Sequence, residues 1–323
     1  MRRTAEDEVD GPERIELTPQ ACVALSEDLS DVLDALERWS IRVLDVSRLR
    51  RSQVLLYDVG AAGSFPADPG KLSRIANAIW DAHDFRYISS CLPPQRLEPI
   101  ARDLQKAVGG TISRNHPDRT PYQFQSEFVV ATAFAFGGAE PVFPTSEEHE
   151  RPEFFVTSGT RNYGVEVKRP GSWAKGRRAI RKAARQLASP GIDFGLAVVD
   201  VTECVSSEVQ HIVSGGRSEA VFDSFKAEVN RLGGALEDQI WNDRRRCYRP
   251  DGASMAALIT VARSSAWFLD DLSHPSLVPY MRIATFNPSP GRTLRWHRTQ
   301  WLIKTLLTGM TAAGYRMEYG SFT

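Results

Sequence analysis

Residues 151–168 read RPEFFVTSGTRNYGVEVK, and this stretch decides the expected fold. It contains two β-rich runs close together, 153–156 and 163–168, which predict two adjacent strands of a hairpin. Glu166 and Lys168 lie two residues apart in the second run, so both side chains project from one face of the sheet. The valines on either side of Glu166 then point to the opposite face, into a core.

Glu153 is expected on the first strand of this hairpin, next to Glu166 on the second. Adjacent antiparallel strands lie about 4.8 Å apart, so the two carboxylates can converge on one point. Carboxylates held that close repel each other unless a cation lies between them, and a hard divalent ion with oxygen ligands is the usual solution. Mg²⁺ held by carboxylates, waters and a substrate phosphate suits phosphodiester chemistry.

Helical and strand-like patterns alternate on both sides of the hairpin. A helix is predicted over 122–136, before the hairpin, and an amphipathic helix over 173–189, after it. The apolar run FGLAVVDV, residues 194–201, is typical of a central strand. Further patterns are helical over 219–240 and 294–307 and strand-like over 141–143, 256–261 and 281–286. This order predicts an α/β fold with a sheet packed between helices.

The chain before the hairpin domain is mainly helical. Helices are predicted over 18–43, 71–84 and 96–108, whereas 52–59 fits a short strand or the end of a helix equally well. We therefore divide the chain into a mainly helical N-terminal region, residues 1–112, and a domain that carries the hairpin, residues 113–323.

The arrangement resembles the PD-(D/E)xK nuclease superfamily, whose motif consists of a helix Glu, a strand acid and a (D/E)-x-K strand. The matching positions are Glu127, Glu153 and Glu166-Val167-Lys168. The resemblance covers about residues 118–201 and implies a restriction-endonuclease-like mixed sheet flanked by helices. One departure is that the strand acid is Glu where Asp is more frequent, which adds a methylene to the candidate metal ligand.

The resemblance also implies the role of each residue in a nuclease that uses Mg²⁺, for which Mn²⁺ can substitute. Glu153 and Glu166 would hold the metal ion together with the carbonyl oxygen of Val167. Glu127 would bind a second ion or the water shell of the first, and Lys168 would orient or help to deprotonate the attacking water.

Members of this superfamily often carry a further polar residue, commonly Gln or Lys, on the helix after the motif strand. Gln186 or Lys182 matches that position here, and Gln186 is taken as a catalytic candidate that positions the substrate backbone.

Charge is distributed unevenly along the chain. The 40 Lys and Arg residues balance the 40 Asp and Glu residues, so the chain is not uniformly basic, but residues 161–185 hold nine basic residues against one acid. Such a helix face beside the motif could hold phosphates, although on an isolated helix it is more typical of a solvated surface. A second cluster comprises Arg244–Arg246 and Arg249. The predicted nucleic-acid-binding residues are Arg169, Lys175, Arg177, Arg178, Arg181, Lys182 and Arg185.

Several other classes of protein are disfavoured by motifs that the chain lacks. The four cysteines are scattered without a C-x-x-C pair, and the sequence contains no phosphate-binding G-x-x-x-x-G-K-[ST], no G-x-G-x-x-G after a strand and no G-x-S-x-G. No apolar stretch has the roughly 18 residues of a membrane span, and the N-terminus lacks a secretory apolar segment, so we expect a cytoplasmic protein.

The sequence leaves several alternatives open. The first is a nuclease that acts on nucleic acid, with DNA favoured over RNA by the resemblance alone and a role in restriction or defence suggested by analogy. The second is a catalytically inactive nucleic-acid-binding module on the same fold. The third is a regulatory protein whose N-terminal region binds a protein partner. Endonuclease and exonuclease action, and monomer and homodimer, are not distinguished.

Overall fold

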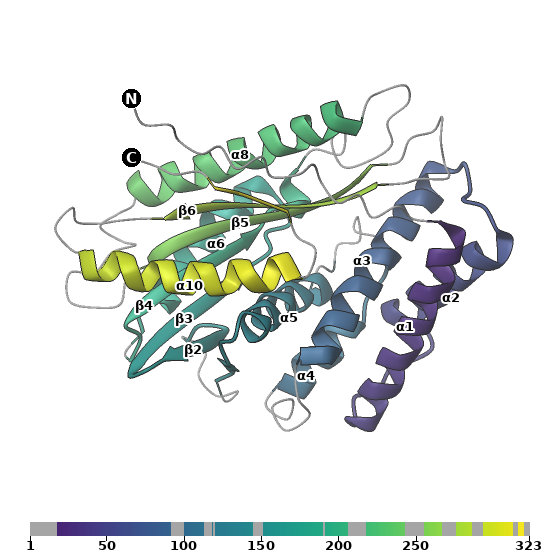
Figure 1. The fold of residues 1–323 in the computed structure, drawn as a ribbon, viewed down its shortest axis with the longest axis horizontal. Coiled ribbons are helices and arrows are strands. Elements are labelled where there is room, and N and C mark those ends of the chain that lie inside the picture. Colours follow the sequence, from purple (N-terminus) through teal and green to yellow (C-terminus); the bar gives the residue numbers. More distant parts are fainter. Residues whose placement is uncertain are drawn as a thin grey trace, which may run out of the picture.

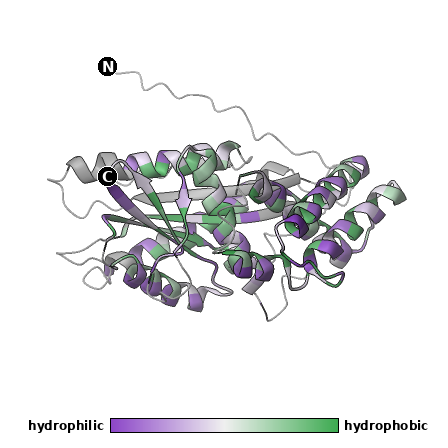
Figure 2. Cartoon of the chain, turned by 90° about the horizontal axis from the view of Figure 1, so that it is seen from below, coloured by the Kyte–Doolittle hydropathy of each residue, from purple (hydrophilic) through white to green (hydrophobic). Residues whose placement is uncertain are grey.

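The computed structural model describes eleven parts of the 323-residue chain, namely residues 18–91, 100–112, 118, 120–144, 151–189, 191–205, 218–242, 255–266, 276–285, 293–312 and 316–319. Within these residues seven strands form one mixed sheet in the order β1 to β7. Helices lie on both sides of this sheet, and the N-terminal helices extend the molecule at one end (Figures 1 and 2). The predicted α/β fold, with a mixed sheet flanked by helices, is confirmed.

The elements follow the alternation that the sequence indicates. The helices are α1 (Pro19–Arg38), α2 (Arg48–Ala62), α3 (Pro69–Cys91), α4 (Ala101–Val108), α5 (Thr120–Phe136), α6 (Trp173–Gln186), α8 (Ser218–Asn242) and α10 (Thr293–Ala312), with the short 3-10 helix η3 (Thr202–Cys204). The strands are β1 (Pro141–Val142), β2 (Phe154–Ser158), β3 (Arg161–Lys168), β4 (Phe194–Asp200), β5 (Met255–Ala266), β6 (Ser276–Thr285) and β7 (Arg316–Tyr319).

The centre of the sheet is parallel and its edges are partly antiparallel. β2 and β3 form the expected antiparallel hairpin, β3, β4 and β5 run parallel, β6 is antiparallel to β5, and β7 is parallel to β6. The β2–β3 pairing extends only as far as Phe154 opposite Val165, whereas β3 continues beside β4 as far as Lys168. The last residues of β3 therefore extend past the start of β2.

Two hydrophobic layers cover the two faces of the sheet. Val165 and Val167 belong to the cluster that also contains residues of α5 and α10. Ala197 and Val199 of β4 face the other way, into a cluster with residues of α6 and α8. Because side chains alternate along a strand, the apolar run of β4 supplies both layers, as its central position requires.

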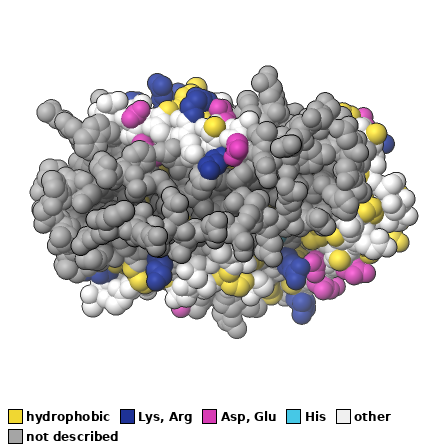
Figure 3. All heavy atoms as spheres, turned by 45° about the horizontal axis from the view of Figure 1, so that its top comes forward, with side chains coloured by type: hydrophobic (Ala, Val, Ile, Leu, Met, Phe, Trp, Pro, Cys, Tyr) yellow, Lys and Arg dark blue, Asp and Glu magenta, His cyan; other side chains and the backbone are white. Residues whose placement is uncertain are grey.

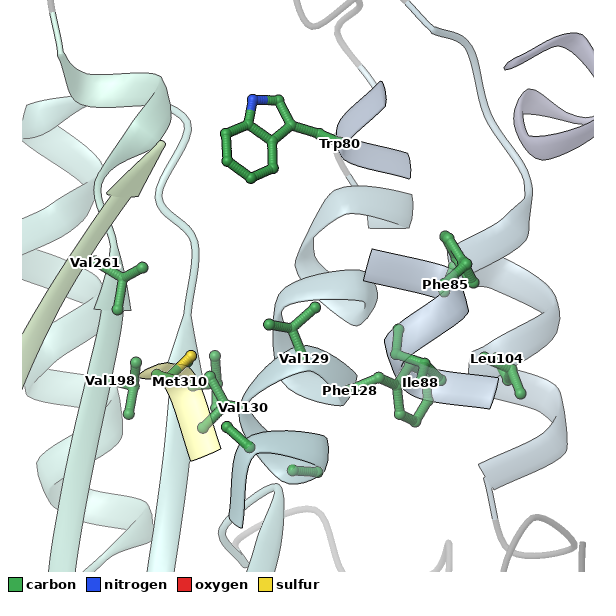
Figure 4. Packing of buried hydrophobic residues seen from close by; sticks show 14 of the residues in the cluster. Trp80, Phe85, Ile88, Leu104, Phe128, Val129, Val130, Val198, Val261 and Met310 are labelled. Carbon is green, nitrogen blue, oxygen red and sulfur yellow. The ribbon is translucent and has the colours of Figure 1, made fainter. Parts of the chain in front are cut away.

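The N-terminal helices share the first of these layers. Figure 4 shows the cluster running from Trp80, Phe85 and Ile88 of α3, through Phe128 of α5, to Val198 of β4. The core is thus continuous from the N-terminal helices through α5 to the sheet.

Helices α5 and α10 approach each other closely. A Cβ atom added at Gly309 of α10 would lie 1.7 Å from the carbonyl oxygen of Ala133, and one added at Gly137, after α5, would lie 2.0 Å from that of Thr305. Only glycine fits at both contacts, because any larger side chain would overlap the facing backbone.

The stretch 52–59, for which the sequence fits a strand or a helix end, lies within helix α2. Ser47 caps this helix, since its side chain accepts a hydrogen bond from the Arg50 N–H at 3.3 Å, and the left-handed Gly63 (φ 67°) ends it. Among the described residues, no helix combines the length and the apolar character that crossing a membrane requires.

Candidate functional site

The site lies where β2 and β3 part. Glu153 is the residue immediately before β2, not a residue within a strand as expected, and Glu166 and Lys168 lie on the part of β3 that extends past β2. Since Glu166 and Lys168 are two residues apart, their side chains share one face, as the sequence predicts. The acid before one strand and the acid and lysine at the end of the next therefore come together at this point.

The ammonium group of Lys168 joins the two acids. Its Nζ atom lies 2.7 Å from Glu153 Oε1 and is also in contact with Glu166 Oε1. The side chain of Glu166 is completely buried, whereas that of Glu153 is 27% exposed. The Glu166 carboxyl group is in contact with the Lys168 ammonium and lies close to the carboxyl group of Glu153, which raises its pKa. Solvent can therefore reach the cluster from the Glu153 side.

Glu127 approaches the cluster from helix α5. The residue is 8% exposed, and its Oε1 atom accepts a hydrogen bond from Gln123 Nε2 at 2.6 Å. Burial raises the pKa of Glu127 well above its ordinary value, and the nearby charge of Glu153 raises it further. The Glu127 carboxylate is therefore close enough to the other two acids for their charges to repel it.

The cluster holds three carboxylates and one ammonium group. Burial and the charge of Glu153 raise the pKa of Glu166 to about 8, although Lys168 partly offsets them. Burial would lower the pKa of Lys168, but Glu166 and Glu153 outweigh it and raise that pKa above its ordinary value. The lysine is therefore an ammonium ion at neutral pH, and Glu127 and Glu166 bind protons unusually tightly.

Gln186 of α6 holds the segment that carries Glu153. Its Nε2 atom donates a hydrogen bond to the carbonyl oxygen of Arg151 at 3.0 Å, and its Oε1 atom is buried without a partner among the described residues. Lys182, the other residue that matches the helix position of the motif, is exposed. Of the two, Gln186 is the one that contacts the segment before Glu153.

Gln123 is a residue of the site that the sequence reasoning missed. Its carboxamide donates hydrogen bonds to Glu127 and, at 3.0 Å, to the carbonyl oxygen of Val167, and it accepts one from the Arg169 N–H at 2.6 Å. The Val167 carbonyl expected to hold a metal ion thus already has one partner. The four-residue spacing of Gln123 and Glu127 on a predicted helix was the signal available in the sequence.

Arg169 is not on the surface, contrary to its predicted role in binding nucleic acid. The residue is 7% exposed, and its guanidinium group forms ion pairs with Asp200 at 3.2 Å and Glu203 at 2.9 Å. It also donates a hydrogen bond to Ser126 Oγ at 3.2 Å. The charge of Arg169 is therefore compensated inside the protein, where a phosphate cannot reach it.

The other predicted cations lie on the outer face of α6. Ile180, Ala183 and Ala184 form its buried face, and the exposed residues are Lys175, Arg177, Arg178, Arg181, Lys182 and Arg185. On the face drawn in Figure 3, by contrast, the Lys and Arg side chains of the described residues are interspersed with Asp and Glu. The second basic cluster, Arg244–Arg246 and Arg249, lies outside the described residues.

A buried ionic network connects the N-terminal helices to the sheet next to the site. Arg48 of α2 is paired with Asp81 of α3, and Arg263 of β5 is paired with Asp84 of α3. Asp200 at the end of β4 pairs with Arg169 and accepts a hydrogen bond from Ser126. Gln125 links the first two pairs by donating hydrogen bonds to Asp81 and Asp84, and Thr202 links Arg263 to Asp200, so the network reaches from α2 to the residue that follows Lys168.

The site has the donor chemistry of a site for a hard cation but not a preformed arrangement. Among the described residues no group of three or more His, Cys, Asp or Glu side chains is placed to hold a metal ion. The Lys168 ammonium contacts both Glu153 and Glu166. The side chain of Glu166 is completely buried, and this burial is the main cause of its raised pKa.

Comparison of the chain with known proteins gives no relationship from which a function could be read. No protein-family model, no curated protein and no solved structure matches it.

Proposed function

We propose that the chain is a metal-dependent nuclease of the PD-(D/E)xK type that hydrolyses phosphodiester bonds, with DNA as the substrate. The observation that carries the proposal is the contact of Lys168 with both Glu153 and Glu166 at the point where β2 and β3 part. The proposal includes a restriction-endonuclease-like fold, which is supported by the antiparallel hairpin, the parallel neighbour β4 and the helices α5 and α6 on opposite faces.

In the proposed reaction Lys168 acts as an ammonium ion. Because its pKa is raised, it cannot accept a proton from water at neutral pH, so it orients the attacking water and stabilises the negative charge that develops on the phosphate. Glu127, whose pKa is raised well above its ordinary value, would take up the proton that the attacking water loses, because Glu166 would be occupied as a ligand of the metal ion.

Glu153 and Glu166 would hold the metal ion, with Glu127 next to them. Bound Mg²⁺ would polarise the phosphate oxygens and lower the pKa of a bound water. Because Glu166 must lose its proton to bind a cation, metal affinity is expected to rise with pH up to about 8. The exposed cations of α6 would hold the phosphates of the substrate on either side of the cleaved bond.

A cleavage assay tests this function. The protein is incubated with supercoiled plasmid, linear duplex, single-stranded DNA and RNA, each with Mg²⁺, Mn²⁺ or EDTA. We expect cleavage that requires the metal ion, is lost in Lys168→Ala and is retained in Arg231→Ala. Arg231 is the matched control because it is a cation in contact with an acid, Glu228 at 2.8 Å, on the exposed surface of α8.

The assay also has a result that contradicts the proposal. Circular dichroism and thermal melting first show that Lys168→Ala is folded. Undiminished cleavage by this folded variant would rule out the assigned role of Lys168, and cleavage of equal rate in EDTA would rule out a metal-dependent reaction.

A second candidate is an inactive nucleic-acid-binding module, favoured by the exposed cations of α6, whose charge does not depend on the acid cluster. This candidate predicts salt-sensitive binding of nucleic acid, no turnover with any metal ion, and unchanged binding by a Glu153→Gln/Glu166→Gln variant. Fluorescence anisotropy with labelled duplex and single strands, at low and high salt, measures this binding.

A further inference from the structure

The carboxamide of Gln123 joins three parts of the candidate site. One N–H group points to the Glu127 carboxylate at 2.6 Å, and the same nitrogen lies 3.0 Å from the Val167 carbonyl oxygen. The carboxamide oxygen accepts the Arg169 N–H at 2.6 Å. An amide has two N–H donors and one carbonyl acceptor, so this arrangement uses its full donor capacity.

These hydrogen bonds take the place of those that a longer β2 would form with the end of β3. Successive residues of a strand direct their backbone polar groups to opposite edges, so Val167 and Arg169 present theirs to the same edge. β2 pairs with β3 no further than Val165, and beyond this point Gln123 supplies both a donor and an acceptor. The side chain therefore holds the end of β3, on which Lys168 lies, at a fixed distance from α5.

We propose that Gln123 is a positioning residue of the site, a role that rests on the proposed nuclease function. By binding Glu127 and the backbone on both sides of Lys168, it fixes the helix acid relative to the strand acid and the lysine. Gln186 of α6 provides a parallel, because its Nε2 atom donates a hydrogen bond to the Arg151 carbonyl oxygen, two residues before Glu153. Two glutamines from two helices thus set the separation of the chain segments that carry the acids.

Two substitutions separate the contacts of Gln123. Gln123→Met keeps the length of the side chain and removes all three hydrogen bonds. Gln123→Glu keeps an acceptor for the Arg169 N–H but cannot donate to Glu127 or to Val167. The control is Gln53→Met, because Gln53 is also a partly buried helix glutamine, on α2, where it accepts a hydrogen bond from Arg50 at 3.0 Å.

The first measurement is hydrogen exchange of the Arg169 amide by NMR in the metal-free protein, which does not depend on activity. We expect exchange about tenfold faster in Gln123→Met, as loss of one hydrogen bond implies, and near the wild-type rate in Gln123→Glu and Gln53→Met. Equal exchange in wild type and Gln123→Met would overturn the proposal, because the carboxamide would then not hold β3.

The second measurement is the kinetics of metal-dependent cleavage. We expect kcat to fall by about 10–100-fold in Gln123→Met, as is typical when a partner of a metal ligand is removed, with KM near that of wild type. In Gln123→Glu, kcat should fall at least as far, because the new carboxylate faces the Glu127 carboxyl group and the Val167 carbonyl oxygen. An unchanged kcat in folded Gln123→Met, which lacks all three hydrogen bonds, would overturn the positioning role. Absence of cleavage by the wild-type protein would instead refute the proposed function, and with it this role of Gln123, whatever the exchange rates show.

Discussion

Arg48 provides the sharpest test of how the N-terminal helices are joined to the rest of the protein. This arginine is completely buried. Its guanidinium group is paired with Asp81, donates to Gln125 Oε1 at 3.0 Å and to the carbonyl oxygens of Ala107 at 2.5 Å and Gly109 at 3.2 Å. The substitution Arg48→Met keeps most of the side-chain volume and removes the charge and every one of these donors.

The expected loss follows from what the substitution leaves behind. Asp81 is 1% exposed and keeps a hydrogen bond from Ser52 Oγ at 2.8 Å, but its cation is gone. Breaking a buried ion pair by removing one partner costs about 3–5 kcal/mol, because the remaining charge stays buried. Since a domain is stable by only about 5–15 kcal/mol, a large share of the total stability depends on this arginine.

Urea unfolding, followed by circular dichroism and by tryptophan fluorescence, measures the loss. Arg50→Met, two residues along the same helix, is the control: Arg50 is 29% exposed and lies 3.7 Å from Glu37, so we expect a loss below about 1 kcal/mol. In the double variant Arg48→Met/Asp81→Asn the buried charge is removed as well, and the loss should be about 1–3 kcal/mol smaller than the sum of the single losses.

Three results would refute this reasoning. The first is a loss below about 1 kcal/mol in Arg48→Met, and the second is strict additivity in the double variant. The third is a separate unfolding transition for the N-terminal helices, because a continuous core predicts that they unfold together with the sheet.

Three further predictions concern the site, the cationic helix and the packing of α10. Burial raises the pKa of Glu166 from 4.5 to about 8, so its carboxyl group contributes fully to the stability of the metal-free protein below pH 4.5, and this contribution is lost as the pH rises through about 8. In urea unfolding at several pH values, the free energy of unfolding of Glu166→Gln should not show this decrease. The double variant Lys182→Ala/Arg185→Ala should bind duplex DNA more weakly. If each cation contacts one phosphate, the slope of the logarithm of the binding constant against the logarithm of the salt concentration should be smaller in magnitude by about 2. An unchanged slope in anisotropy titrations would exclude these contacts. Gly309→Ala should lower the free energy of unfolding by about 1–3 kcal/mol, because its methyl group would overlap the Ala133 carbonyl oxygen. An unchanged free energy of unfolding in urea would show that α10 can move away from α5.

The hairpin and the helices around it could be predicted because their signals are local. The alternation of residues in 163–168 predicts that Val165 and Val167 face the core and that Glu166 and Lys168 share the other face, and the structure confirms both. The spacing of buried positions in α6, with Ile180, Ala183 and Ala184 on one side, was equally visible in the sequence.

The sequence reasoning was wrong or undecided where it used the composition of a short stretch in place of the position of each side chain in the fold. Arg169 was grouped with the cations of α6 because it lies in the same basic stretch, yet the chain turns it inward to Asp200 and Glu203. The segment 52–59 was undecided because its apolar residues are adjacent, whereas the buried Leu49, Leu56 and Val59 become a helical stripe only when α2 is followed from its start at Arg48.

The sequence by itself determined the α/β alternation and the faces of β3, with Val165 and Val167 on one side and Glu166 and Lys168 on the other. Backbone periodicity acts between neighbours along the chain, so these features can be derived from the sequence. Only the tertiary structure decided that Gln123 bridges α5 and β3, across 44 residues to Val167, and that Arg263 pairs with Asp84, across 179. The physical reason is that a buried polar group requires a hydrogen-bond partner and a buried charge requires a charge of opposite sign, but any part of the chain that the core brings close can supply them.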